Sequence, residues 1–170
     1  MSVIECFPPI VDKQSRIIIL GSMPGRESLR KQEYYGHPRN QFWNIIYSLY
    51  GQQPDTEYSK RASFLKRKRI ALWDVIETCR REGSMDSNIT CEKVNDFDWL
   101  FYGHPNIRHA FFNGTKAYET FRKKIGFKYE GITFTKLGST SPAYVIGFEE
   151  RLKQWKIVKE CLRATADRDD

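Results

Sequence analysis

The stretch Ile17-Ile18-Ile19-Leu20-Gly21-Ser22-Met23-Pro24-Gly25 decides the fold expected for this chain. Four consecutive apolar residues, three of them β-branched, indicate a buried strand, and the glycine-rich residues that follow indicate a tight loop leaving it. The two glycines allow close approach to the backbone, and Pro24 stiffens the turn. The first expectation is therefore a buried strand that ends in a loop able to approach a ligand closely.

Three further apolar runs, at residues 70–73, 109–112 and 132–137, also indicate buried strands. Between and after them, apolar residues recur with helical spacing in residues 42–50, 117–125 and 149–164. Strands that alternate with helices predict an α/β fold with a parallel or mostly parallel sheet. We expect residues 165–170 to form a frayed tail. The side chains expected to be buried in the last helix are Leu152, Trp155, Ile157, Val158 and Leu162.

Polar or glycine residues follow each of the four predicted strands. They are Gly21-Ser22, Asp74, Asn113-Gly114 and Gly138-Ser139. Open parallel sheets bind ligands at the carboxyl ends of their strands. These four junctions are therefore expected to line a single crevice.

The composition is that of a folded, basic protein. A chain of 170 residues with 40% hydrophobic and 14% aromatic residues is not disordered, and its length suits one domain with a sizeable core. The formal net charge is +7 and the isoelectric point about 9.2. Such a charge favours an anionic partner, of which nucleic acid is the first candidate.

Four scattered cysteines argue against a zinc or iron–sulfur site. Cys6, Cys79, Cys91 and Cys161 show no short paired spacing, which is typical of reduced thiols inside a cell. The first residues lack the pattern of a signal peptide, and no stretch is long and apolar enough to cross a membrane. We therefore expect an intracellular protein, in the cytoplasm or with the DNA of a nucleoid or nucleus.

A second motif, Tyr34-Tyr35-Gly36-His37-Pro38-Arg39-Asn40-Gln41-Phe42-Trp43, concentrates aromatics and one amide ahead of a helix. With the loop at residues 21–25 it resembles the first motif of the uracil-DNA glycosylase superfamily, and within it the hypoxanthine-DNA (deoxyinosine) glycosylase branch. Gly138-Ser139-Thr140-Ser141-Pro142-Ala143-Tyr144 resembles the superfamily loop that enters the minor groove. The resemblance spans residues 17–144. It implies a three-layer α/β/α sandwich with a short, mostly parallel four-stranded central sheet, in a single domain over residues 1–170.

The resemblance also implies an activity. It is that of a monofunctional DNA glycosylase that hydrolyses the N-glycosidic bond of a flipped, deaminated base and leaves an abasic site in base excision repair. Hypoxanthine is the base that the branch implies; uracil and mismatched thymine remain open, as does a catalytically silent nucleic-acid-binding module. No cofactor and no metal are expected. The partner would be DNA containing a deaminated base, bound by a monomer away from any membrane.

The catalytic residue implied by the resemblance is Asn40. Other branches carry Asp or Asn at the place of Met23, where the side chain positions water, and this chain departs from them there. An amide can orient water but cannot take up a proton near neutral pH. The alternative role of Asn40 is to cap the helix that follows.

The second implied group binds the base. Tyr35 aligns with the aromatic residue on which the superfamily stacks the flipped base, and stacking of this kind contributes about 1–3 kcal/mol. Asp74 could accept a hydrogen bond from N1–H of hypoxanthine, or instead cap a turn or pair with Arg80 or Arg81. Asn113 could contact the base or cap the helix beginning near residue 115. The full expected group is Gly21, Ser22, Met23, Tyr35, Asp74 and Asn113.

The third implied group contacts the DNA backbone and fills the space that the flipped base leaves. Many relatives carry a histidine in the second loop, and this chain has none there. Either Tyr144 or Val145 could be the wedge between base pairs. Residues 81–87 resemble a superfamily loop that we expect to support the pocket. The group expected to contact DNA is Pro24, Arg26, Lys116, Ser139, Ser141, Pro142 and Tyr144.

Overall fold

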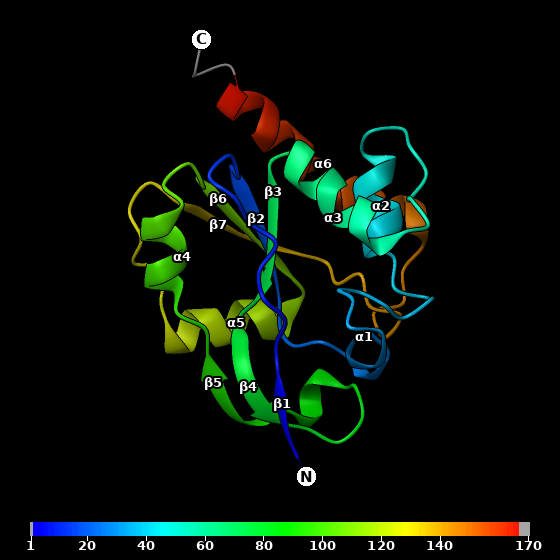
Figure 1. Cartoon of the computed structure of the whole chain (residues 1–170), viewed down its shortest axis with the longest axis vertical. Helices are drawn as coiled ribbons and strands as arrows, with labels where there is room; N and C mark the ends of the chain where they lie inside the picture. The colour runs from blue at the N-terminus through cyan, green and yellow to red at the C-terminus, as the bar shows by residue number, and fades with distance from the viewer. Residues whose placement is uncertain (1, 167–170) are drawn as a thin grey trace.

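A four-stranded parallel sheet forms the centre of the computed structural model, which describes residues 2–166 (Figure 1). Its strands, in spatial order, are β3 (Ile70–Asp74), β2 (Ile17–Gly21), β6 (His109–Asn113) and β7 (Thr133–Leu137). Every neighbouring pair is parallel. The four predicted strands are therefore confirmed. β2 and β3 are buried along their whole length, as expected in a covered parallel sheet, whereas β7 at the edge is only partly buried.

Helices cover both faces of this sheet. Ile17 and Ile19 of β2 pack in one core with α2 (Phe42–Ser48), α3 (Tyr58–Arg67) and α6 (Phe148–Ala166). Ile18 and Leu20 point the other way and pack in a second core with α4 (Phe97–Gly103) and α5 (Thr115–Lys124). Figure 1 shows the two groups of helices on opposite sides of the strands. The expected three-layer α/β/α sandwich is confirmed.

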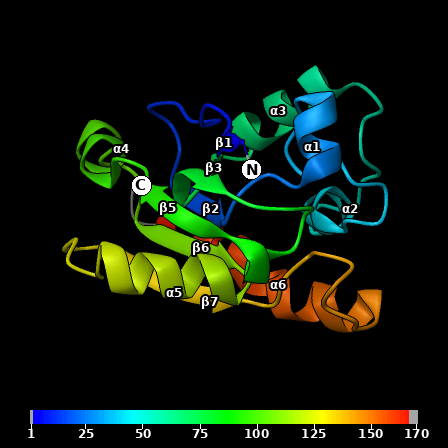
Figure 2. The ribbon, with the colours of Figure 1, turned by 90° about the horizontal axis from the view of Figure 1, so that it is seen from below.

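A second, antiparallel sheet was not predicted. It consists of β1 (Val3–Glu5), β4 (Ile76–Arg80) and β5 (Thr90–Val94), with β4 in the middle. It lies at the lower end of the molecule in Figure 1, the end seen in Figure 2. Most residues of β1 and β5 are exposed or half-buried, so these strands lack the continuous apolar run that marks the central ones.

The carboxyl ends of the central strands meet this small sheet. Only Val75 separates β3 from β4, so the chain passes directly from one sheet into the other. The short helix α1 (Arg26–Lys31) follows the loop after β2, and the single 3₁₀ turn η1 (Asp86–Asn88) lies in the connection between β4 and β5. The crevice expected from the strand junctions therefore opens between the two sheets.

The last helix confirms part of the expectation and corrects the rest. Trp155 and Val158 are fully buried, whereas Leu152 and Leu162 are only half-buried against the same core. Ile157 is 36% exposed, because it lies about 200° around the helix from Trp155. Thr165 and Ala166 belong to α6 rather than to a frayed tail; residues 167–170 of that predicted tail lie outside the described residues. None of the helices in residues 2–166 has the length and apolar character that a membrane span requires.

Candidate active site

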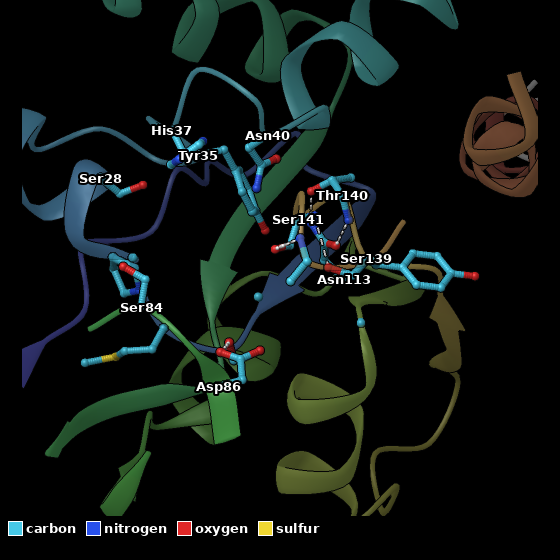
Figure 3. Close-up of a pocket in the computed structure, with 18 of the residues that line it drawn as sticks. Ser28, Tyr35, His37, Asn40, Ser84, Asp86, Asn113, Ser139, Thr140 and Ser141 are labelled. Carbon is cyan, nitrogen blue, oxygen red and sulfur yellow. Dashed lines mark hydrogen bonds between the residues drawn. The ribbon is translucent and has the colours of Figure 1, made fainter. Parts of the chain in front are cut away.

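A cavity of about 690 Å³ lies at the carboxyl end of the central sheet. This is within the range of about 300–1,000 Å³ usual for small-molecule sites. In Figure 3, Tyr35 and Asn40 lie on one side, Ser84 and Asp86 across from them, and Asn113 with Ser139, Thr140 and Ser141 on a third side. The predicted site residues that line it are Gly21, Ser22, Met23, Pro24, Arg26, Tyr35, Asn40, Asp74, Asn113, Ser139, Ser141, Pro142 and Tyr144.

Lys116 is the one predicted site residue that does not line the cavity. It lies in the first turn of α5, and its Nζ is 3.0 Å from Glu92 Oε2 on β5. The two side chains are 28% and 18% exposed, so this is a half-buried ion pair. The expected phosphate contact would require Lys116 to leave this partner.

Gly21 makes room for the floor of the cavity. A β-carbon at this position would lie 2.5 Å from Asp74 Oδ1 and 2.9 Å from Tyr35 Oη, both closer than non-bonded atoms approach. Asp74 follows from the register of the sheet, since β2 and β3 pair Gly21 with Asp74 at their last residues. The absence of a side chain at Gly21 therefore lets a carboxylate and a phenol converge beneath the loop.

Asp74 is a buried carboxylate with an altered acidity. Its side chain is 4% exposed, and its Oδ2 atom has no hydrogen-bond partner among residues 2–166. Burial, reinforced by the nearby charge of Asp86 and opposed by that of Arg81, raises its pKa from 3.8 to about 7. Asp74 therefore exists near neutral pH both as an acceptor and, when protonated, as a donor. It makes no salt bridge with Arg80 or Arg81 within 4.0 Å, so the pairing alternative is wrong, and Arg81 acts on Asp74 only through its charge.

Tyr35 presents an aromatic surface and a protonated hydroxyl. Its ring stacks on Phe42 with centroids 4.1 Å apart, so Phe42 supports one of its faces. Burial and the charge of Asp74 raise the pKa of the phenol, which therefore remains a donor. The backbone of Tyr35 has φ 55°, a left-handed conformation that costs a non-glycine residue about 1 kcal/mol or more.

Asn40 lines the cavity just ahead of α2. Its Oδ1 accepts a hydrogen bond from the backbone N–H of Phe42, the first residue of that helix, at 3.0 Å. Its own backbone N–H donates to the carbonyl of His37. The N-cap position belongs to Gln41 and has no side-chain cap, so the capping alternative for Asn40 is wrong. The bond to Phe42 fixes the orientation of the amide at the cavity.

The side chain of Asn113, at the end of β6, binds the loop after β7 and does not cap α5. Its Nδ2 donates to Thr140 Oγ1 and its Oδ1 accepts from the Thr140 backbone N–H, both at 2.9 Å. The residue at the N-cap of α5 is Gly114, without a side-chain cap, so the capping alternative for Asn113 is wrong. Gly114 has φ 96° and its α-carbon faces Ser139, where a β-carbon would meet Ser139 Cβ at 3.1 Å. These contacts seat the loop after β7 against the end of β6.

Residues 81–86 hold the first loop in place. Ser22 Oγ donates to Asp86 Oδ1 at 2.7 Å, and the buried Arg81 donates to the carbonyl of Pro24 at 2.5 Å. Ser84 Oγ accepts from the backbone N–H of Arg26 at 2.8 Å. Burial raises the pKa of Asp86 as well, against the lowering effect of its bond from Ser22. These contacts agree with the support expected of this loop.

Met23 and the rim differ in their exposure. Met23 lines the cavity, is 7% exposed and packs in one cluster with Ile76 and Ile89. Tyr144 and Val145 at the rim are 39% and 88% exposed. Because Val145 is not part of the core, its side chain can contact another molecule without disturbing the packing of this one.

Several residues of the site were not singled out in the sequence. Thr140 stood between two predicted serines, and its bonds to Asn113 need a pairing of loops that the sequence does not display. Asp86 and Arg81 belong to the loop at residues 81–87, which resembles a superfamily loop. That resemblance could have indicated these two residues. Within residues 2–166, no group of three or more His, Cys, Asp or Glu side chains is arranged to hold a metal ion.

Comparisons with known proteins agree with this geometry. The model of the "Uracil DNA glycosylase superfamily" matches residues 8–163. A "Hypoxanthine DNA glycosylase" of Methanosarcina barkeri is 42% identical over 125 residues, which cover 72% of this chain and 79% of the relative. One of the same name from Methanosarcina acetivorans is 44% identical over equal shares.

A solved structure is also similar. It is the solution NMR structure of a protein from Methanosarcina acetivorans described as a proposed uracil DNA glycosylase. The identity is 39% and the TM-score 0.82, over 95% of this chain and 99% of the other. A family match over most of the chain, with the same fold and a cavity at the expected edge of the sheet, leads to one conclusion. This chain belongs to the uracil DNA glycosylase superfamily.

Proposed function

We propose that this chain is a monofunctional DNA glycosylase that removes hypoxanthine from deoxyinosine in DNA and leaves an abasic site. The names of relatives at 42% and 44% identity support hypoxanthine as the base. The net charge of +7 supports binding of a polyanion. The enzyme acts as a monomer inside the cell, since one cavity holds the residues that the reaction needs.

The observation that carries this proposal is the unpartnered Asp74 carboxylate at the edge of a cavity of base-binding size. A buried polar atom without a hydrogen bond is costly, which favours sites where a ligand supplies the partner. Ionised Asp74 accepts a hydrogen bond from N1–H of the flipped hypoxanthine. Adenine presents only a ring-nitrogen acceptor at N1, so the same carboxylate disfavours the undamaged base.

The base lies against the face of Tyr35 that Phe42 leaves uncovered. Its extrusion costs a few kcal/mol, and less at a weakly paired lesion. Arg26, Ser139 and Ser141 contact the DNA backbone beside the cavity, and Val145 or Tyr144 fills the vacated space. Lys116 is kept out of this contact by its ion pair with Glu92.

The bond that breaks joins C1′ of the sugar to N9 of the base. The electron pair goes to the base, whose growing negative charge is spread by hydrogen bonds to its polar edge. Asn40 orients a water molecule whose oxygen bonds to C1′, and the proton that this water loses ends on the departing base or the solvent. An amide cannot hold that proton, so the step depends on leaving-group stabilisation rather than on a strong general base.

The test is cleavage of duplexes that each carry one deoxyinosine, deoxyuridine or mismatched thymine, followed by alkaline scission of abasic sites. Scission at deoxyinosine that falls in Asn40→Ala supports both the base and the residue. Scission mainly at deoxyuridine keeps the reaction and replaces the substrate. Tight binding without scission at any lesion would overturn the enzymatic proposal in favour of a silent binding module.

A matched variant separates catalysis by Asn40 from its hydrogen bond to α2. Asn40→Ser keeps an oxygen that can accept from the Phe42 N–H, whereas Asn40→Ala loses this hydrogen bond, which contributes about 0.5–1.5 kcal/mol. If the amide acts on the reaction, both variants lose activity while only Asn40→Ala loses stability. Activity retained in Asn40→Ser would limit Asn40 to its structural role.

A further inference from the structure

In the loop between β7 and α6, residues 138–147, several carbonyl oxygens accept hydrogen bonds from the rest of the protein. The carbonyl of Gly138 accepts a hydrogen bond from Trp155 Nε1 at 2.9 Å. The carbonyl of Thr140 accepts from the backbone N–H of Gln41 at 3.0 Å. This loop carries several of the proposed DNA contacts, so the direction of its peptide dipoles matters for an anionic ligand.

One side chain, Arg151, binds three further carbonyls of this loop. Its Nε donates to the carbonyl of Ser139 at 3.0 Å, and its Nη2 donates to the carbonyls of Ser141, at 3.5 Å, and Tyr144. Its guanidinium also lies 5.8 Å from the centre of the Tyr144 ring. A planar fork with several donors is the side chain best suited to gather carbonyls in this way.

Arg151 occupies an unfavourable place for a cation. The residue is 4% exposed and lies in the first turn of α6, near the positive end of the helix dipole. No carboxylate of residues 2–166 lies within 4.0 Å of its guanidinium. Burial without a counter-charge lowers its pKa, although an arginine remains protonated. A buried cation held by carbonyls alone costs stability, which points to a use other than stability.

The arrangement favours an anion on the outer side of the loop. The negative ends of the peptide dipoles point inward, and a positive charge lies directly beneath them. The outward side chains include Ser139 and Ser141 at the cavity and the exposed Val145 at the rim. Phosphate contacts fix the position of DNA on a protein, so the shape of this loop would decide how the strand is held.

We propose that Arg151 is a positioning residue for DNA: it holds loop 138–147 in the conformation that grips the phosphate backbone of the lesion strand and sets the wedge at its rim. The inference rests on the proposed function of the cavity. Arg151 itself does not touch the base or the reacting atoms. Substitution of Arg151 should therefore reduce the affinity for DNA more than the rate of the chemical step.

The test is single-turnover cleavage of a deoxyinosine duplex at increasing protein concentration, which separates the half-saturating concentration from the maximal rate. Arg151→Met, which keeps the length and loses the donors, should raise the half-saturating concentration about tenfold or more and change the maximal rate much less. Arg151→Lys keeps the charge but reaches fewer carbonyls, so it should fall between. Low, non-denaturing guanidinium chloride should restore affinity to Arg151→Ala, whereas sodium chloride of equal ionic strength should not.

Trp155→Phe serves as a comparison variant from the same helix. It removes the donor to the Gly138 carbonyl together with part of a buried ring, and it should weaken DNA binding slightly. Melting temperatures identify the folded variants; if Arg151→Met does not fold, Arg151→Lys and Trp155→Phe carry the test. An unchanged half-saturating concentration in folded variants, or a loss confined to the maximal rate, would overturn the inference. The affinity of each variant for abasic-site DNA can be compared with that of the wild type without any catalysis. If the wild-type protein binds this DNA but cleaves no deoxyinosine duplex, the result counts against the proposed function and not against the role of Arg151.

Discussion

Asp74 Oδ1 lies 2.5 Å from the position that a β-carbon on Gly21 would occupy. The floor of the cavity therefore depends on the absence of one methyl group. We expect Gly21→Ala to displace the carboxylate, to lower the free energy of unfolding by about 1–3 kcal/mol and to reduce base release at least as strongly. Denaturant unfolding and the deoxyinosine assay measure the two effects.

The control for this change is Gly103→Ala. A β-carbon at Gly103, the last residue of α4, would meet nothing within 4 Å. We expect this variant to keep its stability to within about 0.5 kcal/mol and its full activity. Wild-type activity in Gly21→Ala would show that the cavity floor can accommodate a β-carbon at this position, and it would contradict the prediction.

Substitution of Asp74 should separate stability from activity. A carboxyl group whose folded-state pKa is raised from 3.8 to about 7 binds more protons in the folded than in the unfolded state between those values. The contribution of Asp74 to the free energy of unfolding is therefore most favourable at low pH. It is lost as the pH rises from about 4 to about 7. Asp74→Asn removes the charge, so at pH 8 it should stabilise the fold by a few kcal/mol and at pH 4 by much less.

The same variant should lose activity, because the hydrogen bond to an ionised group contributes about 1.5–3 kcal/mol and an amide oxygen is a weaker acceptor. Unfolding curves at pH 4 and pH 8, with cleavage of deoxyinosine at pH 8, give both quantities. An Asp74→Asn protein that is less stable than wild type at pH 8 would contradict the cost assigned to the buried charge.

The pH dependence of cleavage tests the form in which Asp74 acts. If the ionised carboxylate accepts N1–H of the base, the single-turnover rate should rise with pH and level off above about 7. The rate of Asp74→Asn should lack this rise. A wild-type rate that instead falls between pH 6 and pH 8 would assign the action to the protonated acid.

Val145 offers a test of the wedge. Its side chain is 88% exposed, so Val145→Ser should leave the stability within about 0.5 kcal/mol. If Val145 fills the space of the flipped base, the variant should flip and release the base more slowly, which a fluorescent base next to the lesion would report. Tyr144→Ser is the companion variant, and an effect confined to it would transfer the role to Tyr144.

The central fold was predictable because its signals are local. The apolar runs at β2 and β3 are continuous and buried along their whole length, since both faces of the sheet are covered there, whereas the edge strand β7 alternates and includes Lys136. The small sheet was missed because its strands are short and half-exposed: Thr90–Val94 carries two charged residues and offers no apolar run. Ile157 was misplaced because an apolar residue on an exposed helix face looks the same in the sequence as a buried one.

The members of the site could be anticipated more readily than their contacts. Strand ends and the two loops brought the expected residues to one cavity, since parallel strands carry their carboxyl ends to one edge. The partners of Asn113, Lys116 and Arg151 depend on how separate loops and helices meet, and nothing in the spacing of these residues indicates them. Asn40 was predicted with two roles, but the N-cap position belongs to Gln41, and Asn40 bonds the Phe42 N–H from one residue earlier.

The passage of the chain from β3 into β4 through Val75 ties both sheets together at the floor of the cavity. The backbone N–H groups of Val75 and Ile76 donate to the carbonyls of Gly21 and Ser22, and Asn95 donates to those of Asp74 and Val75. Under the proposed function, base choice would depend on this junction, and the grip on DNA would depend on a loop seated by side chains of α6. Because the two parts are built on separate elements, substitutions in the loop would change the affinity for DNA while the junction keeps its preference among bases. We therefore expect affinity and base selectivity to vary independently among variants of these two parts.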